Sequence, residues 1–322
     1  MKDFGTQKSR QQNNPNRYQR KGILPERRKN FSTLLSLLVL LPAFVLISCR
    51  KSPVPGIPAE LPAVDSTITT VMIRNGSGFP AKNLQLLVYD CEGTQSLEAL
   101  LRFSEVPDSV EILLPEGEKL IAAVANMPKS LSPVSLARYG SLDELGYDFS
   151  DEDPEFPILS GVGATVGQTG EILLGPLLCS VEISAISNSM DNYELVENPR
   201  VRLANINSYA GIMQTEDFYP TEIIDYGEWT CLPYDIGMFT QHPGTVLHCY
   251  PNETAESSIS GLRTSLELQC EILGKTCTFE TALPPFGRDS RVLVEMTVNG
   301  PDSFNSSVRV EKQEKPVGSP AE

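Results

Sequence analysis

The chain has 322 residues, of which 40% are hydrophobic, and it carries a formal net charge of −15. Of its 26 Lys and Arg residues nine precede Cys49, against two of its 41 Asp and Glu residues, so the remainder has a charge near −22. Such an acidic field repels nucleic-acid phosphates and anionic lipid head groups. The negative charge therefore excludes a nucleic-acid partner. Its simplest explanation is that it keeps the exposed surface of the protein soluble.

The first predicted element is a lipoprotein signal over residues 1–48. An apolar run at 31–47 follows the basic leader and is shorter than the roughly 20 residues of a membrane-spanning helix. The run ends in Leu46-Ile47-Ser48-Cys49, which resembles the lipobox of bacterial lipoproteins. We predict cleavage between Ser48 and Cys49 and acylation of the Cys49 thiol, which would hold the chain on a membrane. The alternative is a signal anchor with an incidental Cys, which would also place the rest of the chain outside the cytoplasm.

Residues 49–63 form the second predicted element, a lipidated and proline-rich tether. The stretch holds several prolines and no periodic apolar pattern. Such a composition is typical of an extended linker. The tether would keep the body that follows away from the membrane.

Short strand-like segments then fill residues 64–175, the predicted N-terminal β-sandwich domain. Each segment alternates or runs apolar and is bounded by Gly, Pro, Asn or Asp, which is the pattern of a sandwich. Residues 133–146 are predicted to hold short helices, and the acidic stretch 148–157 is predicted to be a surface loop. The predicted strands are 66–74, 83–90, 109–114, 119–125 and a hairpin of 158–162 with 171–174 that turns through the glycine-rich stretch 161–170.

A second β-sandwich domain is predicted over residues 176–311, because Gly175-Pro176 precedes a long alternating strand that begins near Leu177. The polar residues 312–322 are predicted to be a disordered tail. The chain is therefore predicted to be all-β, with two domains after the signal and tether. The further strands are predicted at 200–207, 245–250, 265–272, 276–281, 291–298 and 306–310.

Six cysteines remain once Cys49 is assigned to lipid, and an even number outside the cytoplasm permits disulfides. Cys270 and Cys277 flank Leu273-Gly274 in a predicted hairpin, so they could face each other across it. A Cys270–Cys277 disulfide is one prediction, and two buried free thiols are the alternative.

No residues stand in the motifs that carry catalysis or bind metals. The only histidines, His242 and His248, lie in no metal or nucleophile motif. No Gly-x-Ser-x-Gly elbow occurs, and Ser77 in Asn75-Gly76-Ser77-Gly78 is interpreted as a turn residue. We therefore predict that the chain is not an enzyme and that it binds no metal or cofactor.

Two further runs of the chain carry motifs. In the first half Leu86-Leu87-Val88-Tyr89-Asp90 is followed by Ile112-Leu113-Leu114-Pro115-Glu116-Gly117 and by a strand that ends in Ala125-Asn126. In the second half Tyr250-Pro251-Asn252 is followed by a hairpin with Gly274-Lys275 and by Gly300-Pro301. In their order these runs resemble the type V pilus proteins, the fimbrillins and their minor-fimbrium anchor relatives. The resemblance implies two tandem transthyretin-like β-sandwich domains and a role in building or anchoring a surface fimbria.

The resemblance also implies sites and partners. Polymerising members of the family lose the first strand when a protease cuts after an Arg, and the groove accepts a donor strand from the next subunit, whereas anchors keep the lipid and the strand. Arg74 is then a candidate cleavage point, with an ordinary strand-end Arg as the alternative. Ser66 and Ser109, each preceded by Asp, resemble O-glycosylation acceptors of exported proteins. The implied partners are fimbrial subunits bound by donor-strand exchange, the outer membrane through the lipid, and a host or bacterial surface ligand.

The first hypothesis is thus a non-enzymatic outer-membrane lipoprotein, an anchor or accessory subunit at the cell surface or on a fimbrium. One rival is a polymerising fimbrial subunit that is cleaved after Arg74. Another is a surface glycan-binding lipoprotein, which an exposed row of aromatic residues on one sheet face would indicate. Trp229 is the only Trp, with tyrosines close to it in the sequence. Arg50-Lys51 follows Cys49 in place of the acidic run that some surface-exported lipoproteins carry. The sequence therefore does not decide which leaflet of the outer membrane would hold the lipid.

Overall fold

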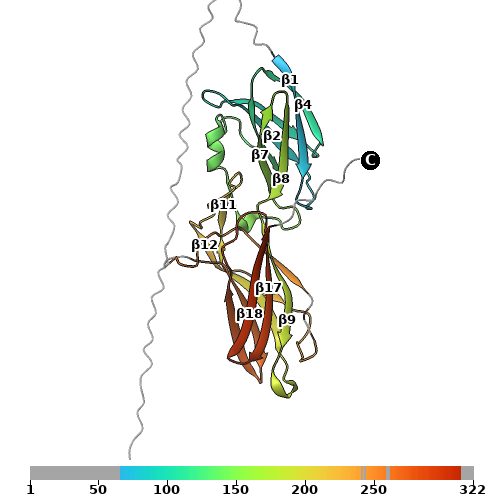
Figure 1. Ribbon diagram of the computed structural model, residues 1–322, viewed down its shortest axis with the longest axis vertical. Coiled ribbons are helices and arrows are strands. Elements are labelled where there is room, and N and C mark those ends of the chain that lie inside the picture. Colours follow the sequence, from blue (N-terminus) through green and yellow to red (C-terminus); the bar gives the residue numbers. More distant parts are fainter. Residues whose placement is uncertain (1–65, 241, 243, 259–261, 313–322) are drawn as a thin grey trace, which may run out of the picture. The chain divides into compact units, whose positions relative to one another are not determined.

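The computed structural model describes residues 66–240, 242, 244–258 and 262–312, all within the compact unit Glu60–Glu322. Strands dominate this part of the chain, which otherwise holds three short 3₁₀-helices (Figure 1). The all-β prediction is therefore confirmed. No helix among the described residues is both long and apolar enough to cross a membrane. The predicted signal, Ser48, Cys49, the tether and residues 313–322 lie outside the described residues.

The first half of the described chain forms a seven-stranded sheet in the order β3-β2-β5-β7-β8-β1-β4. β1 runs parallel to β8, and all the other neighbouring strands are antiparallel. The sheet curls on itself, because residues of β1, β4 and β8 share one core with residues of β2, β5 and β7. The strands are β1 (Ser66–Asn75), β2 (Leu84–Asp90), β3 (Leu97–Phe103), β4 (Ser109–Pro115), β5 (Lys119–Ala125), β7 (Leu159–Val166) and β8 (Thr169–Pro176).

β2 and β5 are buried on both faces. Their second face, which includes Leu87 and Val124, packs against Leu136 and Leu142 from the segment between β5 and β7. That segment contains the 3₁₀-helix η1 (Tyr139–Glu144), so the short helix predicted within 133–146 is confirmed. Burial on both faces explains why these two strands read as continuous apolar runs instead of alternating.

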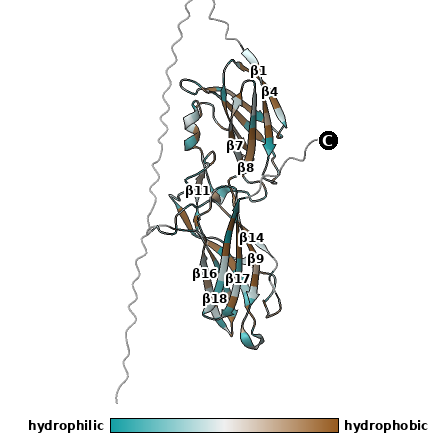
Figure 2. Ribbon diagram, viewed as in Figure 1, coloured by the Kyte–Doolittle hydropathy of each residue, from teal (hydrophilic) through white to brown (hydrophobic). Residues whose placement is uncertain are grey.

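The second half forms two facing sheets. One has the order β12-β10-β15-β16, with β13 also paired to β10, and the other has the order β14-β9-β17-β18. Inward-facing residues such as Val181, Leu268 and Val294 meet in a single core, and Figure 2 shows apolar residues spaced along these strands. The strands are β9 (Cys179–Asn188), β10 (Glu197–Asn207), β12 (Ile223–Tyr226), β13 (Thr230–Cys231), β14 (Thr245–Cys249), β15 (Ser265–Ile272), β16 (Lys275–Ala282), β17 (Ser290–Gly300) and β18 (Ser303–Lys312).

A small two-stranded sheet connects the two halves of the chain. β6 (Gly146–Asp148) pairs antiparallel with β11 (Tyr209–Gly211). Beside it, Tyr147 and Phe149 of the first half pack against a separate apolar cluster that includes Phe218 and Tyr250 of the second half. Each half thus has a main core of its own, while these contacts join the halves. The domain boundary at residue 176 stays a prediction.

Most predicted strands are confirmed, and those at 119–125 and 265–272 have the predicted ends. The glycine-rich stretch 161–170 is different, because most of it lies within β7 and β8 and only the two residues between Val166 and Thr169 form the turn. The prediction missed β3, β6, β11, β12 and β13. β3 gives no alternating signal because nearly all its residues are half-buried, and the other four strands have two to four residues.

Candidate assembly site around the first strand

β1 lies inside its sheet and not at an edge. It pairs with β4 from Ser66, opposite Pro115, to Met72, opposite Ser109, and with β8 from Thr70 to Asn75. β1 is also the first strand of the described chain, so it could be lost without cutting the remaining strands apart. Its loss would leave unpaired backbone groups on β8 and β4, and a strand from another chain could restore these hydrogen bonds.

The side chains of β1 alternate between core and solvent. Thr69, Val71 and Ile73 are at most 5% exposed, whereas Ile68 is 58% exposed and Met72 39%. Val71 and Ile73 belong to the shared core of the sheet. Each such apolar side chain contributes roughly 1.5 to 3 kcal/mol on burial, so β1 is a substantial part of the core that it enters.

Arg74 lies one residue before the end of β1. Its Nε is 3.0 Å from Oε1 of Glu171, and both side chains are about half exposed, so the ion pair contributes little to stability. The backbone of Arg74 pairs with Leu173 of β8, and that of Asn75 pairs with Leu174. The Arg74–Asn75 peptide bond is therefore part of a sheet, and a protease would need this end of β1 to open. Cleavage after Arg74 and a plain strand-end role both stay predictions.

A tight turn follows β1. Ser77 donates a hydrogen bond from Oγ to Oδ1 of Asn75 at 2.6 Å, and Phe79 N donates to Ser77 Oγ at 3.1 Å. Ser77 is also 6% exposed. The prediction that Ser77 is a turn residue is confirmed.

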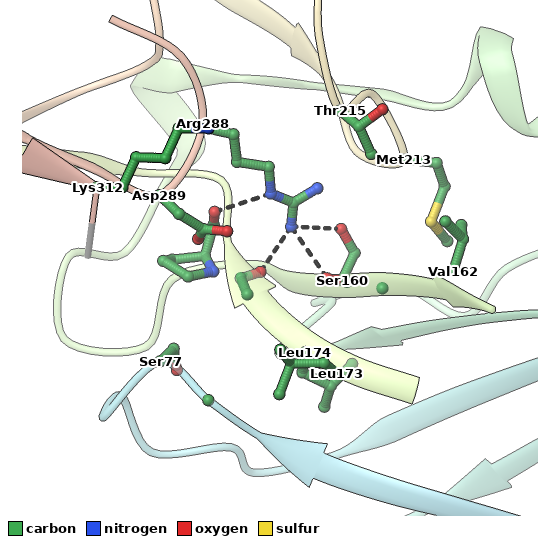
Figure 3. Close-up of a pocket in the computed structure, with 14 residues that line it drawn as sticks. Ser77, Ser160, Val162, Leu173, Leu174, Met213, Thr215, Arg288, Asp289 and Lys312 are labelled. Carbon is green, nitrogen blue, oxygen red and sulfur yellow. Dashed lines mark hydrogen bonds between the residues drawn. The ribbon is translucent and has the colours of Figure 1, made fainter. Parts of the chain in front are cut away.

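A cavity of about 420 Å³ lies where β1 ends (Figure 3). Its walls are Gly76 and Ser77 after β1, the adjoining parts of β7 and β8, and Met213 and Thr215 after β11. Arg288 and Asp289 before β17 and Lys312 at the end of β18 complete it. The cavity thus lies between the two halves of the chain, next to the turn that follows Arg74.

The guanidinium of Arg288 joins the two halves at this cavity. Its Nη2 donates to Ser160 O at 3.0 Å and to Gly175 O at 2.6 Å, and its Nε donates to Pro176 O at 3.0 Å. Its Nη1 donates to the carbonyl oxygens of Ile212 and Gln214 at 3.1 and 3.3 Å. Burial lowers the pKa of Arg288, and the neighbouring charge of Asp289 opposes that effect. The group acts as a structural joint, because it bonds to carbonyl oxygens of both halves.

No local pattern in the sequence indicates the contacts of Arg288. Arg288 follows the loop between β16 and β17, more than a hundred residues from Ser160 and Gly175, and its main acceptors are backbone atoms that any residue would supply.

A second joint uses the stretch 148–157, which was predicted to be only a surface loop. Glu152 accepts a hydrogen bond from Tyr250 OH through Oε2 and one from Ile158 N through Oε1 at 2.6 Å. Burial raises the pKa of Glu152, while these two hydrogen bonds oppose that effect. Most of the stretch is exposed, as a surface loop is, whereas Glu152 is partly buried and its carboxylate links the loop to the second half.

The two predicted glycosylation residues lie at opposite ends of the β1–β4 ladder. Ser66 begins β1 and Ser109 begins β4, and both are exposed. Their hydroxyl groups are thus on the surface, and their modification stays a prediction.

The predicted hairpin around Leu273-Gly274 is confirmed. Both residues have positive φ, 52° and 73°, as a two-residue type I′ turn requires. The register places Cys270 opposite Cys277, while the structure holds both as free thiols. The facing positions are confirmed, and the disulfide stays a prediction.

The histidines lie apart from any group of metal ligands. His242 is 3% exposed, with its ring 5.6 Å from that of Tyr234. Burial lowers the pKa of His248, whose neighbour Cys249 points into the core. Within the described ranges no three His, Cys, Asp or Glu side chains come together as metal ligands.

The aromatic residues around Trp229 are stacked with arginines. The Arg202 Cζ lies 4.0 Å from the ring centroid of Tyr226 and 4.2 Å from that of Trp229, and the Arg200 Cζ lies 4.9 Å from the Trp229 centroid. Arg202 also pairs with Glu267 at 2.6 Å. Cation–π contacts therefore occupy ring surface that a sugar would need for stacking.

Comparison with protein-family models and with curated proteins found no match. Solved structures share the fold. A candidate cell adhesion protein from Parabacteroides distasonis has a TM-score of 0.58 at 15% identity, covering 76% of this chain and 95% of that one. The tip fimbrial protein Mfa3 from Porphyromonas gingivalis has a TM-score of 0.54 at 9% identity, with coverages of 76% and 99%. A fimbrilin, FimA, from the same organism also has 0.54, at 11% identity, with coverages of 76% and 96%. The resemblance to fimbrillins is thus confirmed in the fold.

Proposed function

We propose, starting from a fold shared with a fimbrilin and a fimbrial tip protein, that this chain is an outer-membrane lipoprotein that serves a cell-surface fimbria as an anchor or accessory subunit. Cys49 would carry the lipid, and the two halves would be tandem transthyretin-like domains on a proline-rich tether. The protein would act by contacts with other fimbrial subunits and not by catalysis.

The position of β1 is the observation that supports this proposal best. β1 is the first described strand, yet it lies between β8 and β4 and buries Val71 and Ile73 in their common core. A chain that keeps β1 has this groove filled, as suits an anchor at the end of a filament. A chain that loses β1 has an open groove that a donor strand of a fimbrial subunit would fill.

Mass spectrometry of the N-terminus tests the proposal. We would isolate the protein from native membranes and, separately, from sheared surface filaments. An acylated Cys49 on the intact chain in the membrane fraction is the expected result. An N-terminus at Asn75 in the filament fraction would mean instead that β1 is removed and that the chain polymerises. An unmodified chain found only in the cytoplasm would refute the proposal.

A variant of Arg74 separates the anchor from the polymerising subunit. If cleavage after Arg74 occurs, Arg74→Ala should abolish the species that begins at Asn75. Arg309→Ala is the matched control, because Arg309 is an exposed strand Arg that also pairs with a Glu. For an anchor that keeps β1, neither variant changes the N-terminus.

A further inference from the structure

Four of the six described cysteines lie in the core of the second half, and they form two facing pairs. Cys179 of β9 lies opposite Cys249 of β14, and Cys270 of β15 lies opposite Cys277 of β16. All four are at most 4% exposed and belong to one core cluster. In contrast, Cys231 is exposed on β13 opposite Arg200, and Cys91 follows β2 in the first half.

The register of both pairs fits a covalent bond. Residues directly opposite in an antiparallel ladder have Cα atoms roughly 4.5 to 5.5 Å apart. A disulfide requires a Cα separation of roughly 4.4 to 6.8 Å. In the thiol form Cys179 Sγ donates to Gly287 O at 3.3 Å, a weak bond that little favours the reduced state.

Each pair connects an edge strand to its inner neighbour. β14 is the outermost strand of the sheet β14-β9-β17-β18, and β16 is the outermost strand of the sheet β12-β10-β15-β16. Edge strands are the ones that peel away or exchange between molecules. A disulfide in each sheet would therefore fasten one edge strand, β14 in one sheet and β16 in the other. The two sheets pack on the same core.

We infer that Cys179 and Cys249 form a cross-strand disulfide in the mature protein, which together with Cys270–Cys277 fastens one edge strand of each sheet in the second half. This rests on the export that the proposed function requires. Each bond forms when two thiols lose two protons and two electrons to the disulfide of an exported thiol oxidase, whose own cysteines are reduced. Because the four residues are buried in the folded chain, the exchange takes place before the core closes.

With these two disulfides, the strands of the two halves would be held in different ways. The seven-stranded sheet contains no facing cysteine pair among its described residues, so no such cross-link holds β1, which is kept in place by hydrogen bonds, packing and the exposed Arg74–Glu171 ion pair. The second half has one edge of each sheet fastened. Strand exchange at β14 and β16 would then be prevented, whereas the β12 and β18 edges and the first half carry no such bond.

Differential alkylation of the full chain tests the bond. The protein, taken from the cell envelope, is denatured with N-ethylmaleimide, reduced and then labelled with iodoacetamide. We expect maleimide on Cys91 and Cys231 and iodoacetamide on the two facing pairs, with unreduced digests giving a 179–249 linked peptide. Maleimide on Cys179 and Cys249, or a link from either to another cysteine, would overturn the inference.

Purified full chain refolded with oxidised glutathione separates this inference from the proposed function. A 179–249 link formed there supports the inference even if the protein in cells is cytoplasmic, a location that would count against the proposed function alone. Failure to form the link there, or in a chain found at the cell surface, overturns the inference alone.

Matched double variants give a second readout. In Cys270→Ala/Cys277→Ala the remaining bond closes a loop of roughly 70 residues, whereas in Cys179→Ala/Cys249→Ala the remaining bond closes only a hairpin. A longer closed loop restricts the unfolded chain more. Reductant should therefore lower the Tm of the first variant by roughly 10 °C and that of the second by about half as much. Equal Tm values with and without reductant in the first variant would contradict the bond.

Discussion

Arg288 satisfies five backbone carbonyl oxygens beside the cavity at the end of β1. We expect Arg288→Ala to lower the free energy of unfolding by roughly 3 kcal/mol, because several acceptors lose their partner at once. Arg288→Lys should lower the free energy of unfolding somewhat less, because its ammonium group keeps the charge but cannot reach all five oxygens. Denaturant titration measures both changes.

Arg291→Ala is the control for this prediction. Its guanidinium is partly exposed and bonds to the side chain of Glu182, so its loss should cost under about 1 kcal/mol. If Arg288→Ala costs no more than Arg291→Ala, the joint does not stabilise the fold.

Glu152 makes stability depend on pH with a sign that can be tested. Burial raises its folded pKa above the ordinary 4.5, so the folded chain keeps a proton at pH values where the unfolded chain has released it. The contribution of Glu152 to the free energy of unfolding therefore falls as pH rises from below 4.5 through the raised pKa. Glu152→Gln should remove this part of the pH dependence, which begins near the ordinary pKa of 4.5 and extends upward from it.

Denaturant titration at several pH values measures this effect, with Glu116→Gln as the control on an exposed turn residue. Identical pH profiles for wild type and Glu152→Gln would rule out the assigned role of Glu152.

Among the elements, β1 fills the place between β8 and β4 in the seven-stranded sheet of the first half. Val71→Ala should lower the free energy of unfolding by about 2 kcal/mol, because it removes buried methyl groups from a side chain with no exposure. Met72→Ala, the next residue but on the outward face, should change it by less than about 0.5 kcal/mol. Thermal or chemical unfolding of the two variants compares the faces of one strand.

Similar losses for Val71→Ala and Met72→Ala would mean that β1 does not enter the core with the described alternation. A larger loss for Val71→Ala alone would support β1 as the strand that fills the groove.

At the scale of the whole molecule, the two main cores are joined by the β6–β11 sheet, by the apolar cluster beside it and by a small number of polar contacts. The main cores of the halves are separate, while Arg288 and the Glu152–Tyr250 pair bridge them. We expect the wild type to unfold in one calorimetric transition and the Arg288→Ala/Glu152→Ala variant in two, because each half keeps its own core. A single transition in the double variant, merely shifted to lower temperature, would show that other contacts couple the halves.

The strand pattern was predictable because alternation and apolar runs are local properties of the sequence. The segments 119–125 and 265–272 and the Leu273-Gly274 turn were found with their correct ends, since burial and turn chemistry act within a few residues. The lipobox prediction for Cys49 likewise depends only on neighbouring residues.

Only the tertiary structure showed that β1 is inserted between β8 and β4, that Arg288 binds carbonyl oxygens of both halves, and that Cys179 faces Cys249. These partners are separated by roughly 40 to 130 residues in the chain. Their pairing depends on strand order and register, which follow from the joint burial of many side chains. No local sequence pattern predicts this joint burial, because the area that each side chain buries depends on residues that are distant in the chain and become its neighbours only in the folded protein.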